Sequence, residues 1–134
     1  MDQTSQPPAP KKKSRKKLYA IVAVPKTTDI VPGGTVESVP AGEYYALEFN
    51  TTGSGTFAVS VIATNGITFY LVTPSEYSSD LSSGLWSTYS FTSGHISSGS
   101  FNTNIGSGTC DAVFYNSNFI TTSTITINTM SYTS

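Results

Sequence analysis

The stretch that decides the fold is GEYYALEFNT, residues 42–51. Behind its leading glycine, Tyr45, Leu47 and Phe49 occupy alternate positions, with smaller or polar residues between them. A period of two carried by aromatic and aliphatic side chains indicates a β-strand that buries one face. Further alternating runs lie at 57–61, 67–71 and 124–127, and no segment has a convincing helical period. The chain is therefore predicted to be all-β.

Short turn signals separate these runs, with Gly- or Pro-rich breaks at 32–34, 40–42, 53–55 and 106–108. Asn65-Gly66 lies between two alternating runs and predicts a type I′ hairpin turn, because both central residues of that turn need positive φ. Short strands with such turns favour a single antiparallel β-sandwich, jelly-roll or immunoglobulin-like, of about seven or eight strands. We expect strands over most of 36–130 and no helix longer than about two turns.

Residues 108–117, GTCDAVFYNS, echo residues 42–51 at a constant offset along the chain. The echo predicts one hairpin used twice, in equivalent positions of two sheets; chance convergence of a common strand–turn–strand pattern is the alternative. The alternation also predicts the side chains that face the core, namely Tyr45, Leu47, Phe49, Val59, Val61, Ala112, Phe114, Ile125 and Ile127.

Both copies resemble the strands of extracytoplasmic β-sandwich modules, of which the GOLD-like and the bacterial and archaeal pre-peptidase-like domains are examples. The resemblance is carried by residues 39–50 and 108–116, which follow the pattern G-x-Y-x-hydrophobic-x-F-x-N. It implies a non-catalytic module outside the membrane. The chain departs from the family pattern at Cys110 and Asp111, where an aromatic residue is usual.

Charge is completely segregated along the chain. All seven basic residues lie within the first 26, whereas residues 27–134 contain seven acidic residues and no Lys or Arg. Ser, Thr and Asn supply 45 of the 108 residues in that second part, so hydroxyl and amide groups replace charge as the solvated surface. Cytosolic domains usually mix Lys and Glu on their surfaces. The composition favours an extracytoplasmic, cell-surface or secreted location, with a virion as the alternative.

The same segregation predicts three parts: a disordered basic arm at 1–17, a short apolar segment that is a linker or a first strand at 18–35, and the β-sandwich at 36–134. The apolar run LYAIVAV at 18–24 is too short to cross a membrane, which takes about 20 residues. It could serve as a marginal signal-peptide core or as a strand.

The arm carries the predicted polyanion-binding residues. Its run of like charges stays extended unless nucleic acid phosphates or anionic lipid headgroups neutralise it. The residues of this run are Lys11, Lys12, Lys13, Arg15, Lys16 and Lys17.

No motif predicts catalysis, a metal or a cofactor, so the chain is not expected to be an enzyme or to have a small-molecule substrate. His95 is the single histidine, and no Gly-x-Ser-x-Gly elbow is present. Cys110 alternates with apolar residues, which favours a buried, inert thiol. Calcium at Glu76 and Asp80 is disfavoured because that ion takes six to eight oxygen ligands.

Two kinds of surface site are expected besides the arm. Tyr77, Trp86 and Tyr89 are candidates for stacking on a ligand, with core packing as the alternative. Asn50 begins the Asn-Thr-Thr sequon and would accept a glycan in a secreted protein.

Two functions remain open on these grounds. In the first, the chain is a non-enzymatic surface module with a structural or interaction role, whose basic arm lies at a membrane or cytoplasmic face. In the second, it is a viral-type coat subunit that assembles into a shell and binds nucleic acid through the arm.

Overall fold

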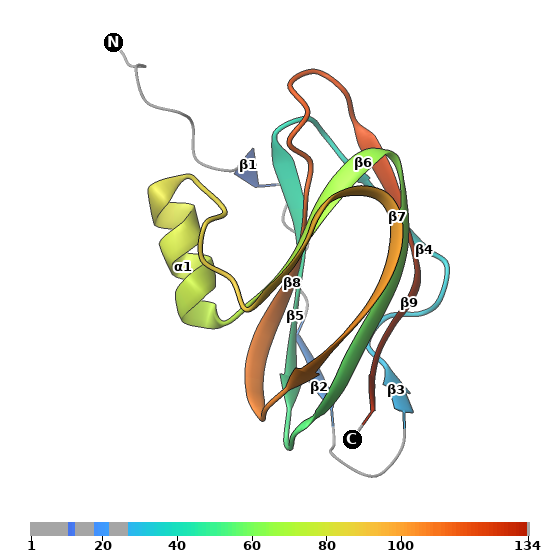
Figure 1. Ribbon diagram of the computed structural model, residues 1–134, viewed down its shortest axis with the longest axis vertical. Coiled ribbons are helices and arrows are strands. Elements are labelled where there is room, and N and C mark those ends of the chain that lie inside the picture. Colours follow the sequence, from blue (N-terminus) through green and yellow to red (C-terminus); the bar gives the residue numbers. More distant parts are fainter. Residues whose placement is uncertain (1–10, 13–17, 22–26, 134) are drawn as a thin grey trace.

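The computed structural model describes residues 11–12, 18–21 and 27–133, and it is a β-sandwich with one helix (Figure 1). The predicted all-β sandwich is confirmed. The elements in chain order are β1 (Lys11–Lys12), β2 (Leu18–Ile21), β3 (Thr27–Asp29), β4 (Thr35–Val39), β5 (Glu43–Thr51), β6 (Gly55–Val72), α1 (Pro74–Ser83), β7 (Phe91–Ile105), β8 (Gly108–Tyr115) and β9 (Ser123–Thr133). No helix among the described residues is long and apolar enough to cross a membrane.

One long strand, β6, belongs to both layers of the sandwich. Its first part pairs with β9 from Thr56 to Ala63, and its last part pairs with β8 from Thr68 to Val72. Strand β7 follows β6 along both parts, so the two form a bent antiparallel pair that arches over the top of the sandwich (Figure 1). The first layer is completed by β5, with β1 and β2 parallel to it, and the second by β3 and β4 beside β9.

The bend lies at residues 63–66, and here the predicted hairpin is wrong. Ile62 pairs with Ser98 and Ile67 pairs with Ile96, so four residues of β6 face one residue of β7. Gly66 does adopt positive φ, at 83°. The two apolar runs on either side of Gly66 nevertheless do not pair with each other. Both belong to β6, and both pair with β7. The Asn65-Gly66 signal therefore marks a bulge that turns one strand from layer to layer.

The echo also has a different meaning from the predicted one. Strands β5 and β8 are direct antiparallel neighbours in one layer, with Leu47 opposite Ala112, and do not occupy equivalent places in two sheets. Leu47 faces the core between the layers, whereas its counterpart at the repeat offset, Val113, faces the opposite side of the sheet. The two copies thus share a pattern but present it to opposite faces.

The core between the layers contains all nine side chains that the alternation assigned to it, each no more than 4% exposed. Aromatic rings form its centre: Phe57 stacks between Phe49 and Phe69, with ring centroids 5.4 and 6.0 Å apart. Phe114 packs against Phe69 at 5.1 Å. This prediction from period two is confirmed.

Helix α1, with 10 residues, is longer than the two turns expected from the sequence, because strong local signals start and end it. Thr73 and Glu76 form a reciprocal capping box, Pro74 occupies the first turn, and Gly84 ends the helix with φ 77°. The helix lies outside the first layer (Figure 1) and covers a second, smaller cluster on that face. Its buried members are Tyr44, Ala46, Val72, Tyr77, Trp86 and Val113.

Truncating the central rings should destabilise the sandwich strongly. Phe49 and Phe114 are fully buried, so replacing either by Ala should lower the free energy of unfolding by about 3–5 kcal/mol. Urea denaturation measures this. Val36→Ala is the matched control, because Val36 is 57% exposed and its truncation should change stability by no more than about 0.5 kcal/mol. Parent-like unfolding of both Phe variants would show that the inward face is misassigned.

Candidate functional site

The loop between β8 and β9 exposes two adjacent apolar side chains. Phe119 is 98% exposed and Ile120 is 92% exposed, the two highest values among the exposed large hydrophobic residues. The loop lies at the end of the sandwich where the paired strands β6 and β7 arch over (Figure 1). We call residues 117–122 the tip loop. Exposure this complete, at neighbouring positions, distinguishes the pair from single surface apolar residues, which are ordinary.

A buried asparagine fixes the base of the tip loop. The Asn116 amide nitrogen donates to the carbonyl oxygens of Val39 and Thr121, at 2.9 and 2.8 Å. The Asn116 Oδ1 accepts from the backbone and side-chain nitrogens of Asn118, at 3.0 and 2.7 Å. Asn116 is fully buried, and these bonds use its whole donor and acceptor capacity. The loop is therefore held in one conformation from within.

The corner of β6 braces the same loop from outside. Asn65 Nδ2 donates to the Thr122 carbonyl at 2.8 Å, and Asn118 Nδ2 donates to the Asn65 carbonyl at 2.9 Å. The backbone nitrogen of Thr124 donates to Thr64 Oγ1 at 2.9 Å. The bulge that bends β6 thus also positions Phe119 and Ile120, which the alternation pattern had not singled out.

The described part of the basic arm lies at this same end. Strand β1 places Lys11 opposite Glu43 in the register. The Glu43 carbonyl accepts from the Asn116 backbone nitrogen at 3.0 Å, so Lys11 lies one strand away from the base of the tip loop. Of the predicted polyanion-binding residues, Lys13, Arg15, Lys16 and Lys17 lie outside the described residues. We also predicted that residues 1–17 are disordered. Apart from Lys11 and Lys12, these residues lie outside the part of the chain that the structure describes.

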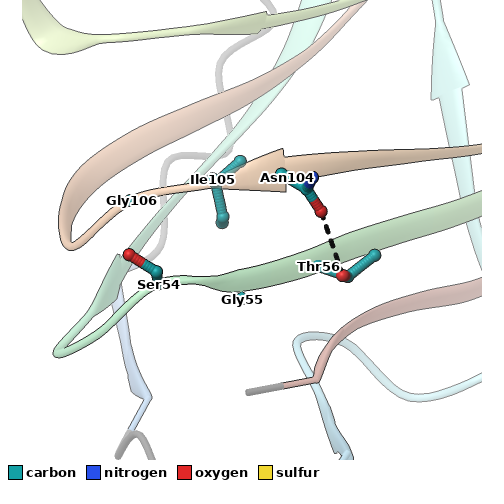
Figure 2. Close-up of a pocket in the computed structure, with 6 residues that line it drawn as sticks. All are labelled: Ser54, Gly55, Thr56, Asn104, Ile105 and Gly106. Carbon is teal, nitrogen blue, oxygen red and sulfur yellow. Dashed lines mark hydrogen bonds between the residues drawn. The ribbon is translucent and has the colours of Figure 1, made fainter.

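The opposite end of the sandwich carries two shallow cavities. The first, of about 500 Å³, lies between the start of β6 and the end of β7, where Thr56 Oγ1 donates to Asn104 Oδ1 at 3.3 Å (Figure 2). The second, of about 370 Å³, shares Asn104, Ile105 and Gly106 and extends to Cys110. Hydroxyl, amide, backbone and apolar groups line both cavities, and neither lining contains a carboxylate or an imidazole. Such walls can bind a ligand, and the Cys110 thiol is the one titratable side chain among the residues that line these two cavities.

The three aromatic candidates come together around Trp86, but mostly below the surface. Trp86 and Tyr77 are 9% and 8% exposed, and their rings contact each other and Tyr44. Tyr89 is 42% exposed and packs on Tyr70. Burial, followed by the neighbouring Tyr89, raises the pKa of Tyr70, which keeps that phenol neutral. Of the three proposed stacking residues, Tyr89 has the accessible ring; ligand stacking stays a prediction.

The acidic residues considered for calcium hold the helix and the segment after it. Glu76 Oε1 accepts from the Thr73 nitrogen and from Ser90 Oγ. Asp80 is fully buried, and its Oδ1 accepts from the backbone nitrogens of Ser87 and Thr88 and from the Thr88 hydroxyl, at 3.2, 2.8 and 2.6 Å. Within residues 27–133 and the two short N-terminal strands, no cluster of three or more His, Cys, Asp or Glu could hold a metal ion.

Three other candidates have clear structural positions. The ring of His95 lies so close to Gly66 that a Cβ added there would be 2.5 Å from the imidazole. Cys110 is half-buried against the main core, and burial, with Asp111 and Glu76 nearby, raises the pKa of its thiol. Asn50 is half-buried in β5, and its Oδ1 accepts from Thr109 Oγ1 at 3.2 Å. Glycosylation at Asn50 stays a prediction.

Comparisons with known proteins support the fold. No protein-family model matches the chain, and no curated protein matches it. Among solved structures, the pre-peptidase C-terminal domain of collagenase from Bacillus anthracis is similar, with a TM-score of 0.53 at 13% sequence identity. The match covers 85% of this chain and 95% of that domain. The resemblance to pre-peptidase-like β-sandwich modules is thereby confirmed for the fold.

Removing the donors of Asn116 should loosen the tip loop. Asn116→Asp keeps the side-chain shape but deprives the Val39 and Thr121 carbonyls of their partner. The Val39 carbonyl is buried, and leaving it unsatisfied costs about 1–3 kcal/mol. Urea denaturation should show this loss, and limited proteolysis should cut at 117–122 faster than in the parent. Asn102→Asp, at an exposed position of β7, is the control. Parent-like stability and cleavage in Asn116→Asp would mean that Asn116 does not hold the loop.

Cys110 should ionise at a higher pH in the folded protein than in the unfolded chain. Burial disfavours the thiolate, so the folded state binds this proton more tightly. The resulting stabilisation is complete below the unfolded pKa of the thiol and is lost as pH rises through the folded pKa. The alkylation rate of Cys110, measured against pH in buffer and in urea, checks this. Coincident midpoints in the two solvents would contradict it.

Proposed function

We propose that the chain is a non-catalytic β-sandwich module that acts through surface contacts, with its basic arm directed at a membrane face. The observation that carries this proposal is the separation of charge. Every Lys and Arg lies in residues 1–26, while the sandwich at 36–134 has acidic residues and no basic ones. Attraction to any polyanionic surface must therefore come from the arm, which leaves the body free for other contacts.

The chemistry of the described residues supports a binding role over catalysis. Glu76 and Asp80 are engaged in capping the helix and fixing the segment after it. Both cavities are lined by groups that do not titrate near neutral pH, apart from the Cys110 thiol, whose pKa is raised. A nucleophile needs an adjacent base or a lowered pKa, and this thiol has the opposite shift.

The surface composition supports a place outside the cytoplasm. Ser, Thr and Asn make up 45 of residues 27–134, and many of these side chains are exposed along β7. A hydroxyl- and amide-rich surface without Lys is unusual for a cytosolic domain. The similarity to a domain of a collagenase agrees with this proposal, although that similarity by itself concerns the fold.

A coat subunit is the second candidate, and the edge of β7 favours it. Among the described strands, this 15-residue strand pairs only with β6, so its other backbone edge is open. It contains no charged residue and no proline, the usual devices that keep an edge strand from pairing with another chain. Pairing between such edges would support lateral assembly, and the arm would then bind packaged nucleic acid.

Replacing the arm's charges should separate the two candidates. A full-length variant with Gln at Lys11, Lys12, Lys13, Arg15, Lys16 and Lys17 should lose binding to anionic vesicles, since each charge contributes about 1 kcal/mol near an anionic leaflet. Vesicle co-sedimentation against salt measures this, and Lys26→Gln is the control outside the run. Binding of the parent to duplex nucleic acid, with a slope of about −0.9 per neutralised phosphate and without vesicle binding, would overturn the membrane-facing function in favour of the coat subunit.

A further inference from the structure

We infer that the tip loop is a membrane-insertion element, in which Phe119 and Ile120 enter the interfacial layer of an anionic bilayer beside the basic arm. This inference rests on the proposed membrane-facing role of the arm and adds to it a second, apolar contact. It assigns a role to the most exposed apolar residues of the described chain.

The hydrogen-bonded tip loop holds Phe119 and Ile120 on the surface, so their exposure is not a packing defect. Neither side chain belongs to the two core clusters, and stacked rings fill the centre of the main core. The loop that carries them is braced by Asn116 and Asn118 from within and by Asn65 from the neighbouring corner. A loop already held in one conformation loses little conformational entropy when it binds.

The shape and surroundings of the pair fit a lipid interface. Both side chains are nearly fully exposed, so they project from the molecule and do not line a groove. Their neighbours in the loop are Ser117, Asn118, Thr121 and Thr122, which are uncharged and can remain among headgroups. Two apolar side chains surrounded by uncharged polar residues can enter the headgroup region without carrying a charge into it.

The position of the basic arm adds electrostatic complementarity at the same end. Lys11 lies opposite Glu43, which is hydrogen-bonded through its backbone to Asn116 at the base of the loop. The basic run therefore begins within one strand of the tip loop. Glu37 and Glu43 also lie toward this end, where β1 supplies the two basic residues Lys11 and Lys12. Stable attachment to a bilayer usually needs an apolar and a basic signal together.

The test uses the full chain and vesicles of phosphatidylcholine with or without phosphatidylglycerol. Phe119→Ser/Ile120→Ser removes the apolar contact, and Val36→Ser/Ile62→Ser removes two other exposed apolar side chains, at 57% and 50% exposure, as a matched control. All four residues are exposed, and thermal unfolding should confirm that every variant is folded. The Gln variant of the basic run is the third protein.

Vesicle binding is measured at low salt and at about 1 M salt, where the screening length falls to about 3 Å. The comparison separates the electrostatic contact of the basic run from the apolar contact of the tip loop. The parent should bind anionic vesicles and retain a salt-resistant part. The tip variant should lose that part, with affinity lowered at least about tenfold per inserted side chain, whereas the control variant should bind like the parent. The Gln variant should lose the salt-sensitive part.

A fluorescent reporter gives a second readout. In Phe119→Trp, the added indole should shift its emission to shorter wavelength on anionic vesicles and be quenched by brominated lipid. The parent, whose Trp86 is buried, supplies the baseline. If the Phe119→Trp variant binds vesicles without a shift in its emission and without quenching by brominated lipid, residue 119 does not insert.

The outcomes distinguish this inference from the function on which it rests. If the tip variant binds like the parent at both salt concentrations while the Gln variant does not bind, the tip is not an insertion element and the arm alone is the membrane contact. If the control variant loses as much binding as the tip variant, the apolar contact is not specific to the loop and the inference fails. If the parent binds nucleic acid but no vesicle, both the inference and the membrane-facing function are overturned.

Discussion

The bend of β6 at residues 63–66 is the constraint on which both layers depend. Eighteen residues of one strand supply hydrogen-bonding partners to β9 on one side of the bend and to β8 on the other. The bend favours glycine at position 66 because the φ there is 83°, which strains any residue with a Cβ, and the exposed His95 ring would also have to move to admit one. Its neighbours Thr64 and Asn65 then tie the corner to the segment that leads into β9. The same corner thus closes the sandwich and positions the tip loop.

The sequence was sufficient for the core but not for the pairing of strands. Alternation identifies which side chains of a strand share a face, and every residue assigned inward on this ground is buried. It contains no information about which strands are neighbours. The Asn65-Gly66 signal therefore correctly predicted a positive φ at Gly66 but had the wrong consequence, since the partner of both flanking runs, β7, comes later in the chain. The echo failed for a related reason: an offset can align Leu47 with Val113 without placing them on the same face.

The helix and the candidate site depended on other kinds of signal. The sequence Thr73-Pro74-Ser75-Glu76 is a capping box with proline at the first helical position, and it was readable without any apolar period. The tip loop has a weaker signature, an apolar pair inside the polar stretch NSNFITTS. Sequence alone cannot tell whether such a pair is buried, because this depends on the hydrogen bonds of Asn116 across the chain to Val39. The polyanion-binding role of the basic run is a prediction from charge alone, and it stays a prediction.

The arrangement gives the molecule two unlike ends. The register of β1 on β5 and the hydrogen bonds of Asn116 bring the first basic residues and the apolar tip to one end. The cavities beside Asn104 lie at the other, near the β5–β6 and β7–β8 turns (Figures 1 and 2). Under the proposed function, contact with an anionic surface through Lys11, Lys12 and the tip loop would favour one orientation of this acidic body. In that orientation the cavity-bearing end points away from the surface. A sandwich that is anchored at one end can therefore present its hydroxyl- and amide-lined end to a second partner without moving any part of the fold.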